Sequence, residues 1–198
     1  SFKSSHVIPA LIRKFYLAQL LSNGNFNAIK KDFLYNKDGM IEIGGMSLEL
    51  SEKSPDEDVL KVLNFYGISS DSDNPKLKTQ NSKFSTTVEI WGTGNATREF
   101  FYVEDAAQAI VAATEKYDKS EPVNIGAGFE ISISDLTALI VDLTDYRGKV
   151  VWNHNQPDGQ PRRMLDTTRA FEEFGFKSST DFKAGLKKTI SWYEANNQ

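Results

Sequence analysis

Arginines that follow glycine-containing turns are the residues of this sequence best suited to bind an anionic ligand. Arg98 follows the Gly-Thr-Gly turn of residues 92–94, and Arg162 and Arg163 follow the Pro-Asp-Gly turn that contains Asp158. Backbone at a glycine turn can approach a ligand closely, and a guanidinium group offers a planar fork of donors that matches phosphate oxygens. This pattern favours a phosphate-containing ligand held by Arg98 and by one of the other two arginines.

The residues needed for a complete catalytic site are absent from the sequence. No Gly-x-Gly-x-x-Gly stands between a strand and a helix, and none of the seven tyrosines is followed by lysine four residues later. Neither Gly-x-Ser-x-Gly nor His-Glu-x-x-His occurs. Two distant histidines and no cysteine argue against a metal site. We therefore predict no catalytic residue and no metal ligand in this chain.

Composition indicates one globular domain, or one domain with an appendage. The chain has 198 residues, of which 39% are hydrophobic, and a net charge of −4. This charge argues against nucleic acid or an anionic membrane as a partner. No apolar run approaches the roughly 20 residues of a membrane span, and the first residues lack a signal-peptide pattern. Without cysteines, a cytoplasmic protein is the expectation.

Hydrophobic periodicity predicts an α/β fold in which strands alternate with helices. In the first half we expect a helix over residues 5–21, a hairpin over 41–50, a helix from 54 to 67 with Pro55 at its first position, and a loop over 69–85. In the second half we expect strands at 88–91, 121–126 and 149–152. Between and after them we expect helices over 103–116, from Ser132, from Asp166 to Gly175, and from Ser179 or Thr180 onward.

Three segments resemble the C-terminal part of the GDP-L-fucose synthase family. They are Ser-Ser-His-Val-Ile-Pro-Ala-Leu-Ile-Arg-Lys-Phe at 4–15, Trp-Gly-Thr-Gly-Asn-Ala-Thr-Arg-Glu-Phe-Phe-Tyr-Val-Glu-Asp at 91–105, and Gln-Pro-Asp-Gly-Gln-Pro-Arg-Arg-Met-Leu-Asp at 156–166. The second motif is shared by many extended short-chain dehydrogenase/reductases of the NAD-dependent epimerase/dehydratase superfamily. The first and third are more specific to the fucose synthase branch. The resemblance covers residues 1–22 and 88–198.

The resemblance implies a nucleotide-sugar-binding lobe in which each matching residue has a role. It implies that the substrate is bound by Lys14, Trp91, Arg98, Asp158 and Arg162, and that His6 contacts the NADP cofactor. Each residue also has a structural alternative. Lys14 could be a solvated helix-face lysine, Trp91 a core residue and Asp158 only a turn former. His6 could lie near the helix cap, and Arg98 could pair with Glu99 or Glu104.

The sequence departs from the family in two ways. The Rossmann core with its glycine-rich loop and Tyr-x-x-x-Lys pair is missing, so NADP is not expected to bind this chain alone. An apolar helix face would then lack its partner; its members are Phe100, Val103, Ala106, Ala107, Ile110 and Val111. In addition, residues 23–87 replace a much shorter connection and form an insertion of unknown role.

These observations lead to one functional hypothesis and two alternatives. The first is a lobe that binds GDP-4-keto-6-deoxymannose and acts with a cofactor domain supplied from elsewhere, as a Rossmann-domain partner chain or within a homodimer. The second is a non-catalytic sugar-nucleotide-binding or interaction protein of the same superfamily. The third is a truncated relative with no activity of its own.

Overall fold

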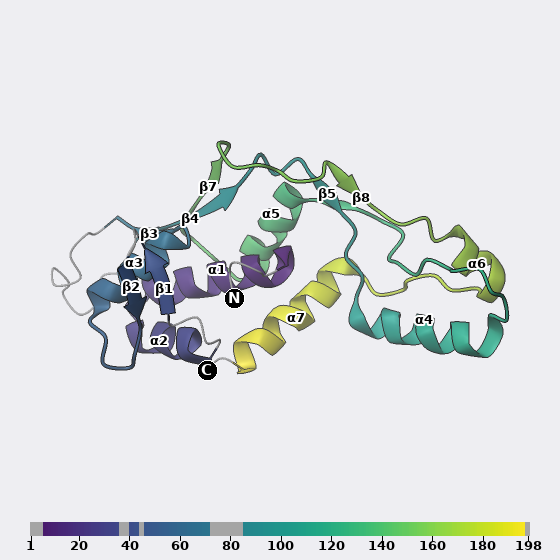
Figure 1. Cartoon of the computed structure of the whole chain (residues 1–198), viewed down its shortest axis with the longest axis horizontal. Coiled ribbons are helices and arrows are strands. Elements are labelled where there is room, and N and C mark those ends of the chain that lie inside the picture. Colours follow the sequence, from purple (N-terminus) through teal and green to yellow (C-terminus); the bar gives the residue numbers. More distant parts are fainter. Residues whose placement is uncertain (1–5, 36–39, 44–45, 72–84, 197–198) are drawn as a thin grey trace.

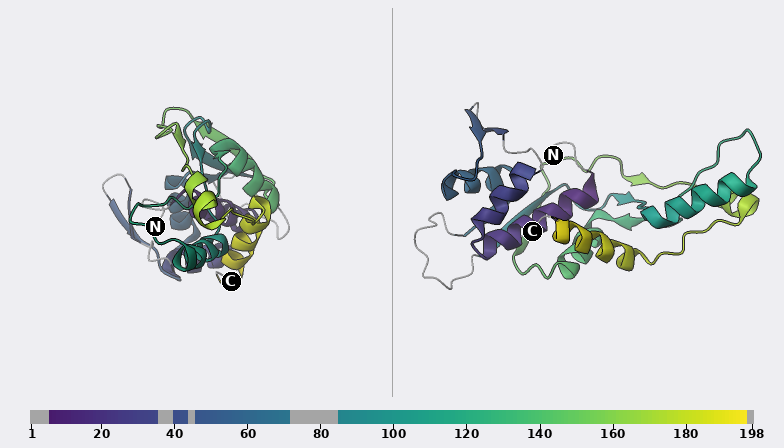
Figure 2. Two further views of the ribbon diagram at one scale, coloured as in Figure 1. Left: turned by 90° about the vertical axis from the view of Figure 1, so that its right-hand side faces the viewer. Right: turned by 90° about the horizontal axis from the view of Figure 1, so that it is seen from below.

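The computed structural model describes residues 6–35, 40–43, 46–71 and 85–196. In these residues the molecule is elongated, with a wide body and a narrower arm (Figure 1). Figure 2 shows the same arm projecting when the molecule is seen from below. The mixture of packed helices and short strands confirms the predicted α/β class.

A three-stranded sheet and helix α1 form the centre of the body. β4 (Thr86–Trp91) is the middle strand, with β3 (Ile68–Ser70) antiparallel on one side and β7 (Lys149–Asn153) parallel on the other. α1 (Val7–Ser22) packs against β3 and β4. Along β4, Val88 and Ile90 are buried whereas Glu89 and Trp91 are not, which is the period-two alternation of a strand with one face in the core.

The helices and strand β3 formed within residues 23–71 pack onto α1 or share its hydrophobic core. This part of the chain forms α2 (Phe26–Tyr35), the antiparallel hairpin β1 (Met40–Ile43) and β2 (Met46–Glu49), and α3 (Asp56–Phe65). Phe33, Val62 and Leu63 are fully buried in one cluster with residues of α1. A buried ion pair also joins α1 to α2, since Arg13 Nε donates to Asp32 Oδ1 at 2.7 Å.

Two further helices complete the body. α5 (Ile133–Leu143) begins after Ser132, whose hydroxyl accepts a hydrogen bond from the Asp135 amide at 3.0 Å. Leu136 and Ile140 are buried on its inner face. α7 (Phe182–Asn196) packs against α5.

The arm consists of α4 and α6 with their connecting segments. α4 (Val103–Lys116) has the predicted bounds and packs against α6 (Thr168–Phe174) around a separate small cluster that includes Ala109 and Phe174. Between body and arm lies a second sheet, with β5 (Thr97–Arg98) flanked by β6 (Ile131–Ser132) and β8 (Arg162–Arg163) (Figure 1). The two arginine-bearing segments of the sequence are therefore hydrogen-bonded neighbours.

Several local predictions were wrong. Pro55 is the residue before the first turn of α3, not its first helical position. Ser69 and Ser70 belong to β3, so the predicted loop is shorter, and residues 72–84 lie outside the described part. Asp181, not Ser179 or Thr180, caps α7 by accepting from the Ala184 amide.

Two predictions about larger elements also need correction. Residues 121–126 are extended but pair with no strand in the part of the chain that the structure describes. Their polar atoms bind individual side chains instead, as when Arg169 donates to Pro122 O. α2 was not predicted, because Asn-Gly-Asn was interpreted only as the end of the preceding helix. Asn25 in fact caps α2, since its Oδ1 accepts from the Ala28 amide at 3.1 Å.

In the described residues no helix is both long and apolar enough to cross a membrane.

Candidate functional site

A cleft of about 620 Å³ lies where α1, the end of α3 and β4 meet. Four of the five residues expected to bind substrate line this cleft: Lys14, Trp91, Arg98 and Asp158. They come from three separate stretches of the chain, so only the fold brings them together. This convergence makes the cleft the candidate functional site.

Lys14 reaches the cleft because of its position on α1. Val7, Ala10 and Leu11 also line the cleft, at the three- and four-residue spacing that puts side chains on one helix face. The ammonium group donates to the backbone oxygen of Glu89 at 2.8 Å. Burial lowers the pKa of Lys14 to about 8, against the opposing effect of the Glu89 carboxylate. Lys14 is therefore not the solvated helix-face lysine of the structural alternative.

Trp91 ends β4 with its indole turned away from the core. The residue is 63% exposed and lines the cleft. The alternative of a buried core tryptophan is therefore wrong. A large exposed ring beside two cations provides a surface for a planar or apolar part of a ligand.

The Asp158 carboxylate is hydrogen-bonded to the glycine turn of residues 92–94, a contact that we call the clasp. Its Oδ1 accepts from the Thr93 amide at 2.5 Å and its Oδ2 accepts from the Thr93 hydroxyl at 2.7 Å. These bonds, led by the one from the Thr93 side chain, lower the pKa of Asp158. Gly92 has φ +86°, and a Cβ there would collide with Asp158 Oδ1. The turn thus has a structural need for both Gly92 and Asp158.

Arg98 is half-buried at the edge of the cleft. Its Nη1 donates to its neighbour's carbonyl, Thr97 O, at 2.7 Å. The expected alternative was an ion pair with Glu99 or Glu104. In the described residues the Glu99 carboxylate instead accepts from the amides of Gly128 and Leu165, and Glu104 pairs with Lys188. The guanidinium therefore keeps donors for a ligand.

Arg162 and His6 lie outside the lining of the cleft. Arg162 Nε donates to both oxygens of Glu130 at 2.8 and 3.0 Å, and Glu130 also accepts from Thr97 Oγ1. Arg162 thereby links β8 to β5 in this structure. His6 is the exposed residue before the first turn of α1, and its side chain makes no capping bond.

The cleft also includes residues that the sequence did not indicate as a site. Residues 64–67, at the end of α3, form one wall, and Glu89 lies beside Lys14. The sequence signalled Gly67 only as a helix terminator, which it is, with φ +75°. No local sequence pattern indicated that Gly67 lies next to Lys14, which is fifty-three positions earlier in the chain.

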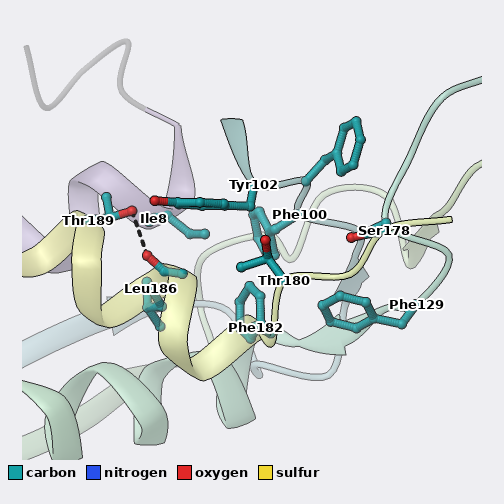
Figure 3. Close-up of a pocket in the computed structure, with 12 residues that line it drawn as sticks. Ile8, Phe100, Tyr102, Phe129, Ser178, Thr180, Phe182, Leu186 and Thr189 are labelled. Atoms are coloured by element: carbon teal, nitrogen blue, oxygen red, sulfur yellow. Dashed lines mark hydrogen bonds between the residues drawn. The ribbon is translucent and has the colours of Figure 1, made fainter. Parts of the chain in front are cut away.

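A second, smaller pocket of about 90 Å³ lies between α7 and the segment that leads into α4 (Figure 3). Its walls are mostly aromatic and aliphatic, with Phe100, Tyr102 and Phe182 prominent. The hydroxyls of Ser178 and Thr180 already bind Asp105. This volume holds a few waters and is too small for a nucleotide.

Comparison with protein families identifies part of the chain. Residues 59–126 match the NAD dependent epimerase/dehydratase family. Over 109 residues the chain is 38% identical to a probable GDP-L-fucose synthase of Oryza sativa, covering 55% of this chain and 33% of that protein. The GDP-L-fucose synthase of Escherichia coli K12 is 33% identical, with 55% and 36% covered. The chain thus spans about a third of the length of these relatives.

Solved structures match nearly the whole chain. A GDP-6-OMe-4-keto-L-xylo-heptose reductase from Campylobacter jejuni is 29% identical with a TM-score of 0.74, covering 99% of this chain and 49% of that one. A GDP-mannoheptose C4 reductase from C. jejuni, solved with NADP, is 28% identical with a TM-score of 0.68, covering 98% and 48%. A GDP-L-fucose synthetase from Naegleria fowleri, at 19% identity and a TM-score of 0.62, shows a shared fold.

Proposed function

From the match of residues 59–126 to the NAD dependent epimerase/dehydratase family and the partial identity to GDP-L-fucose synthases, we propose that the cleft of this chain binds a GDP-linked sugar. In this proposal the chain is the substrate-binding lobe of a GDP-L-fucose synthase-like, NADP-dependent epimerase/reductase that acts on GDP-4-keto-6-deoxymannose. The observation that carries the proposal is the meeting of Lys14, Trp91, Arg98 and Asp158 in one cleft. Two cations suit a diphosphate, the indole suits a ring, and the carboxylate suits sugar hydroxyls.

The residues present do not fit NADP itself. A dinucleotide pyrophosphate needs a glycine loop that runs into a helix N-terminus. Here the glycine turns at 92–94 and 126–128 precede the short strands β5 and β6 instead. We therefore propose that a cofactor domain outside these 198 residues supplies NADP, with His6 as its nearest contact on α1.

The arm is the surface that we propose for that cofactor domain. One face of α4 exposes apolar side chains: Val103 is 71% exposed, Ile110 61% and Val111 57%, and Ala107 is exposed between them. Such a contiguous apolar face is typical of a surface that packs against a partner. Phe100, expected on this face, packs toward the body instead and stacks on Phe182.

The division of the chain is part of the proposal. Residues 1–22 and 88–198 would form the nucleotide-sugar lobe, and residues 23–87 would be an inserted subdomain. The inserted helices share the core of α1. The insertion is thus built into the lobe, and its removal would expose Leu11, Ile12 and Phe15.

A GDP-heptose is a second candidate substrate, and a specific observation favours it. Over nearly the whole chain the two heptose reductases are 28–29% identical to it with TM-scores of 0.74 and 0.68. The GDP-L-fucose synthetase from Naegleria fowleri, which matches 99% of this chain, is 19% identical with a TM-score of 0.62. The greater similarity over the whole chain, inserted segment included, is thus to enzymes whose names specify GDP-heptoses. A seven-carbon sugar would occupy the same cleft.

Calorimetric titration of the purified chain with GDP and GDP-mannose tests the proposal. Arg98→Ala should weaken binding by about 1.5–3 kcal/mol, the usual contribution of a hydrogen bond to a charged group. Arg147→Ala is the matched control, because Arg147 is exposed after α5 and pairs with Asp145 away from the cleft. Equal affinities for wild type and Arg98→Ala, or no binding by a folded chain, would contradict the proposal.

Competition and turnover then refine it. Displacement of GDP-mannose by a GDP-heptose at lower concentration than by GDP-4-keto-6-deoxymannose would favour the heptose candidate. NADPH oxidation by the isolated chain would contradict a lobe that needs a separate cofactor domain.

A further inference from the structure

The wall formed by residues 64–67 is hydrogen-bonded to β4 beside the proposed ligand-binding residues. Gly67 O accepts from the Glu89 amide at 2.7 Å, and Gly67 N donates to Asn64 O at 3.0 Å. A Cβ on Gly67 would lie 3.2 Å from Lys14 Nζ and 3.2 Å from Glu89 Cβ. The inserted segment is thus fastened to β4 beside the cationic group of the cleft.

This wall carries an aromatic side chain with a supported ring. Phe65 is 43% exposed and lines the cleft. Its ring meets the ring of Tyr66 edge-on, with centroids 5.3 Å apart and an interplanar angle of 76°. Tyr66 in turn stacks on the fully buried Phe33 at 5.9 Å. Phe65 is therefore a partly exposed ring that is backed by Tyr66 and, through it, by Phe33.

The cleft has two ends, and Phe65 marks one of them. Lys14 lies at the same end, next to Gly67 and Glu89. Arg98 lies at the other end, and the chain runs from it through Phe100 into α4 of the arm. Phe100 lines the smaller pocket together with Ile8, near the start of α1. Both cations line the cleft, so a diphosphate bound there would contact Lys14 and Arg98.

This geometry fixes the direction of a nucleotide sugar, given the proposed function. If the cofactor domain covers the arm, the reacting sugar must face the Arg98 end, which leads directly into α4. The nucleobase then lies at the opposite end. We infer that residues 64–67 form the nucleobase subsite of the cleft and that Phe65 is the ring on which the base stacks. The inserted segment thereby contributes to ligand recognition.

The test compares GDP with inorganic pyrophosphate, which has the phosphates but no base. Both are titrated calorimetrically into wild type, Phe65→Ala and Phe65→Trp. Because a base stacked on an aromatic ring is strongly affected by alanine substitution, Phe65→Ala should weaken GDP binding roughly tenfold or more and leave pyrophosphate binding unchanged. Phe65→Trp should retain GDP binding, since it keeps a ring.

Tyr35→Ala is the matched control, because Tyr35 is an aromatic of the same inserted segment that is 73% exposed and lies at the end of α2. Circular dichroism melting establishes that each variant is folded. GDP binding that survives Phe65→Ala would overturn the inference and leave the proposed function intact. Equal weakening of GDP and pyrophosphate would also overturn it, by showing that Phe65 shapes the phosphate site. If wild type binds neither ligand, both proposals fail together.

Discussion

The ammonium group of Lys14 donates a 2.8 Å hydrogen bond to the backbone oxygen of Glu89, which lies 75 positions further along the chain. The bond joins the middle of α1 to the strand that ends in Trp91. It occupies one of three N–H donors, so two remain to face the cleft. The same side chain therefore fixes the wall of the cleft and supplies positive charge to it.

The charge of Lys14 should make ligand binding depend on pH. Burial lowers the pKa of Lys14 to about 8, so the ammonium form predominates below that pH and is lost above it. The affinity for GDP should consequently be highest below pH 8 and should fall as the pH rises from 7.5 to 9.5. Titration calorimetry across this range measures the effect.

Lys14→Arg provides the control, because a guanidinium does not lose its proton in proteins. Its GDP affinity should be nearly independent of pH over the same interval. An identical decline in the Lys14→Arg variant would show that another group titrates. The folding linkage has a definite sign as well: the native pKa lies below the unfolded one, so between about pH 8 and 10.5 this lysine makes stability rise with pH.

Gly92→Ala should destabilise the clasp between the glycine turn and Asp158. The position has φ +86°, and the added methyl would collide with the Asp158 carboxylate. A left-handed conformation alone costs an L-residue about 1–2 kcal/mol, and the collision adds to it. Gly175→Ala is the control, because Gly175 has φ +70° with no atom within 4 Å of its Cβ position. Urea unfolding should show a larger loss for Gly92→Ala.

A double variant identifies the cause of that difference. In the Asp158→Ala background the carboxylate is gone, so Gly92→Ala should cost less than in wild type. Equal costs in the two backgrounds would mean that the collision is relieved by movement of the turn.

Asp105 should contribute stability that is lost in acid. It is 1% exposed and accepts from Ser178 Oγ at 2.5 Å, Thr180 Oγ1 at 2.7 Å and Thr180 N at 3.1 Å. Burial raises the pKa of this carboxyl group, but the hydrogen bonds together outweigh burial and lower it. A lowered native pKa means that the stabilisation is present above the unfolded value near 3.8 and is lost as the pH falls through the native one.

The measurement is urea unfolding of wild type and Asp105→Asn at pH 7 and in acid. At pH 7 the variant should lose about 1.5–3 kcal/mol, because hydrogen bonds to a charged acceptor are replaced by weaker ones. The difference should narrow toward pH 3. Asp118→Asn, at an exposed position after α4, should change little at either pH. A pH-independent difference would refute the linkage.

Local signals were sufficient where one segment determines its own structure. Ser132 predicted the start of α5, and its hydroxyl caps the helix by accepting from the Asp135 amide. Gly175 likewise ended α6 in a left-handed conformation. The strand predicted at 121–126 failed because a strand needs a hydrogen-bonding neighbour, which its own residues do not specify.

The candidate site required information that no short pattern contains. The family resemblance selected Lys14, Trp91, Arg98 and Asp158, and the fold shows that they meet. Arg162 matched the same motif, yet its guanidinium binds Glu130, two residues beyond the Gly-Ala-Gly turn at 126–128. Phe65 lay within the inserted segment, where no matching motif existed to suggest a role.

Charged substitutions on the arm should leave the isolated chain folded. Ile110 and Val111 are 61% and 57% exposed on α4, so replacing either with lysine removes no buried contact and should change stability by less than about 0.5 kcal/mol. Ala109→Lys is the contrasting variant, because Ala109 is fully buried against α6 in the arm cluster. It should destabilise by several times that amount, because it introduces a buried charge and overpacks the cluster. Thermal unfolding of the three variants measures both effects. A large loss for Ile110→Lys or Val111→Lys would show that this face is already packed within the chain, and the cofactor domain would then have to bind elsewhere.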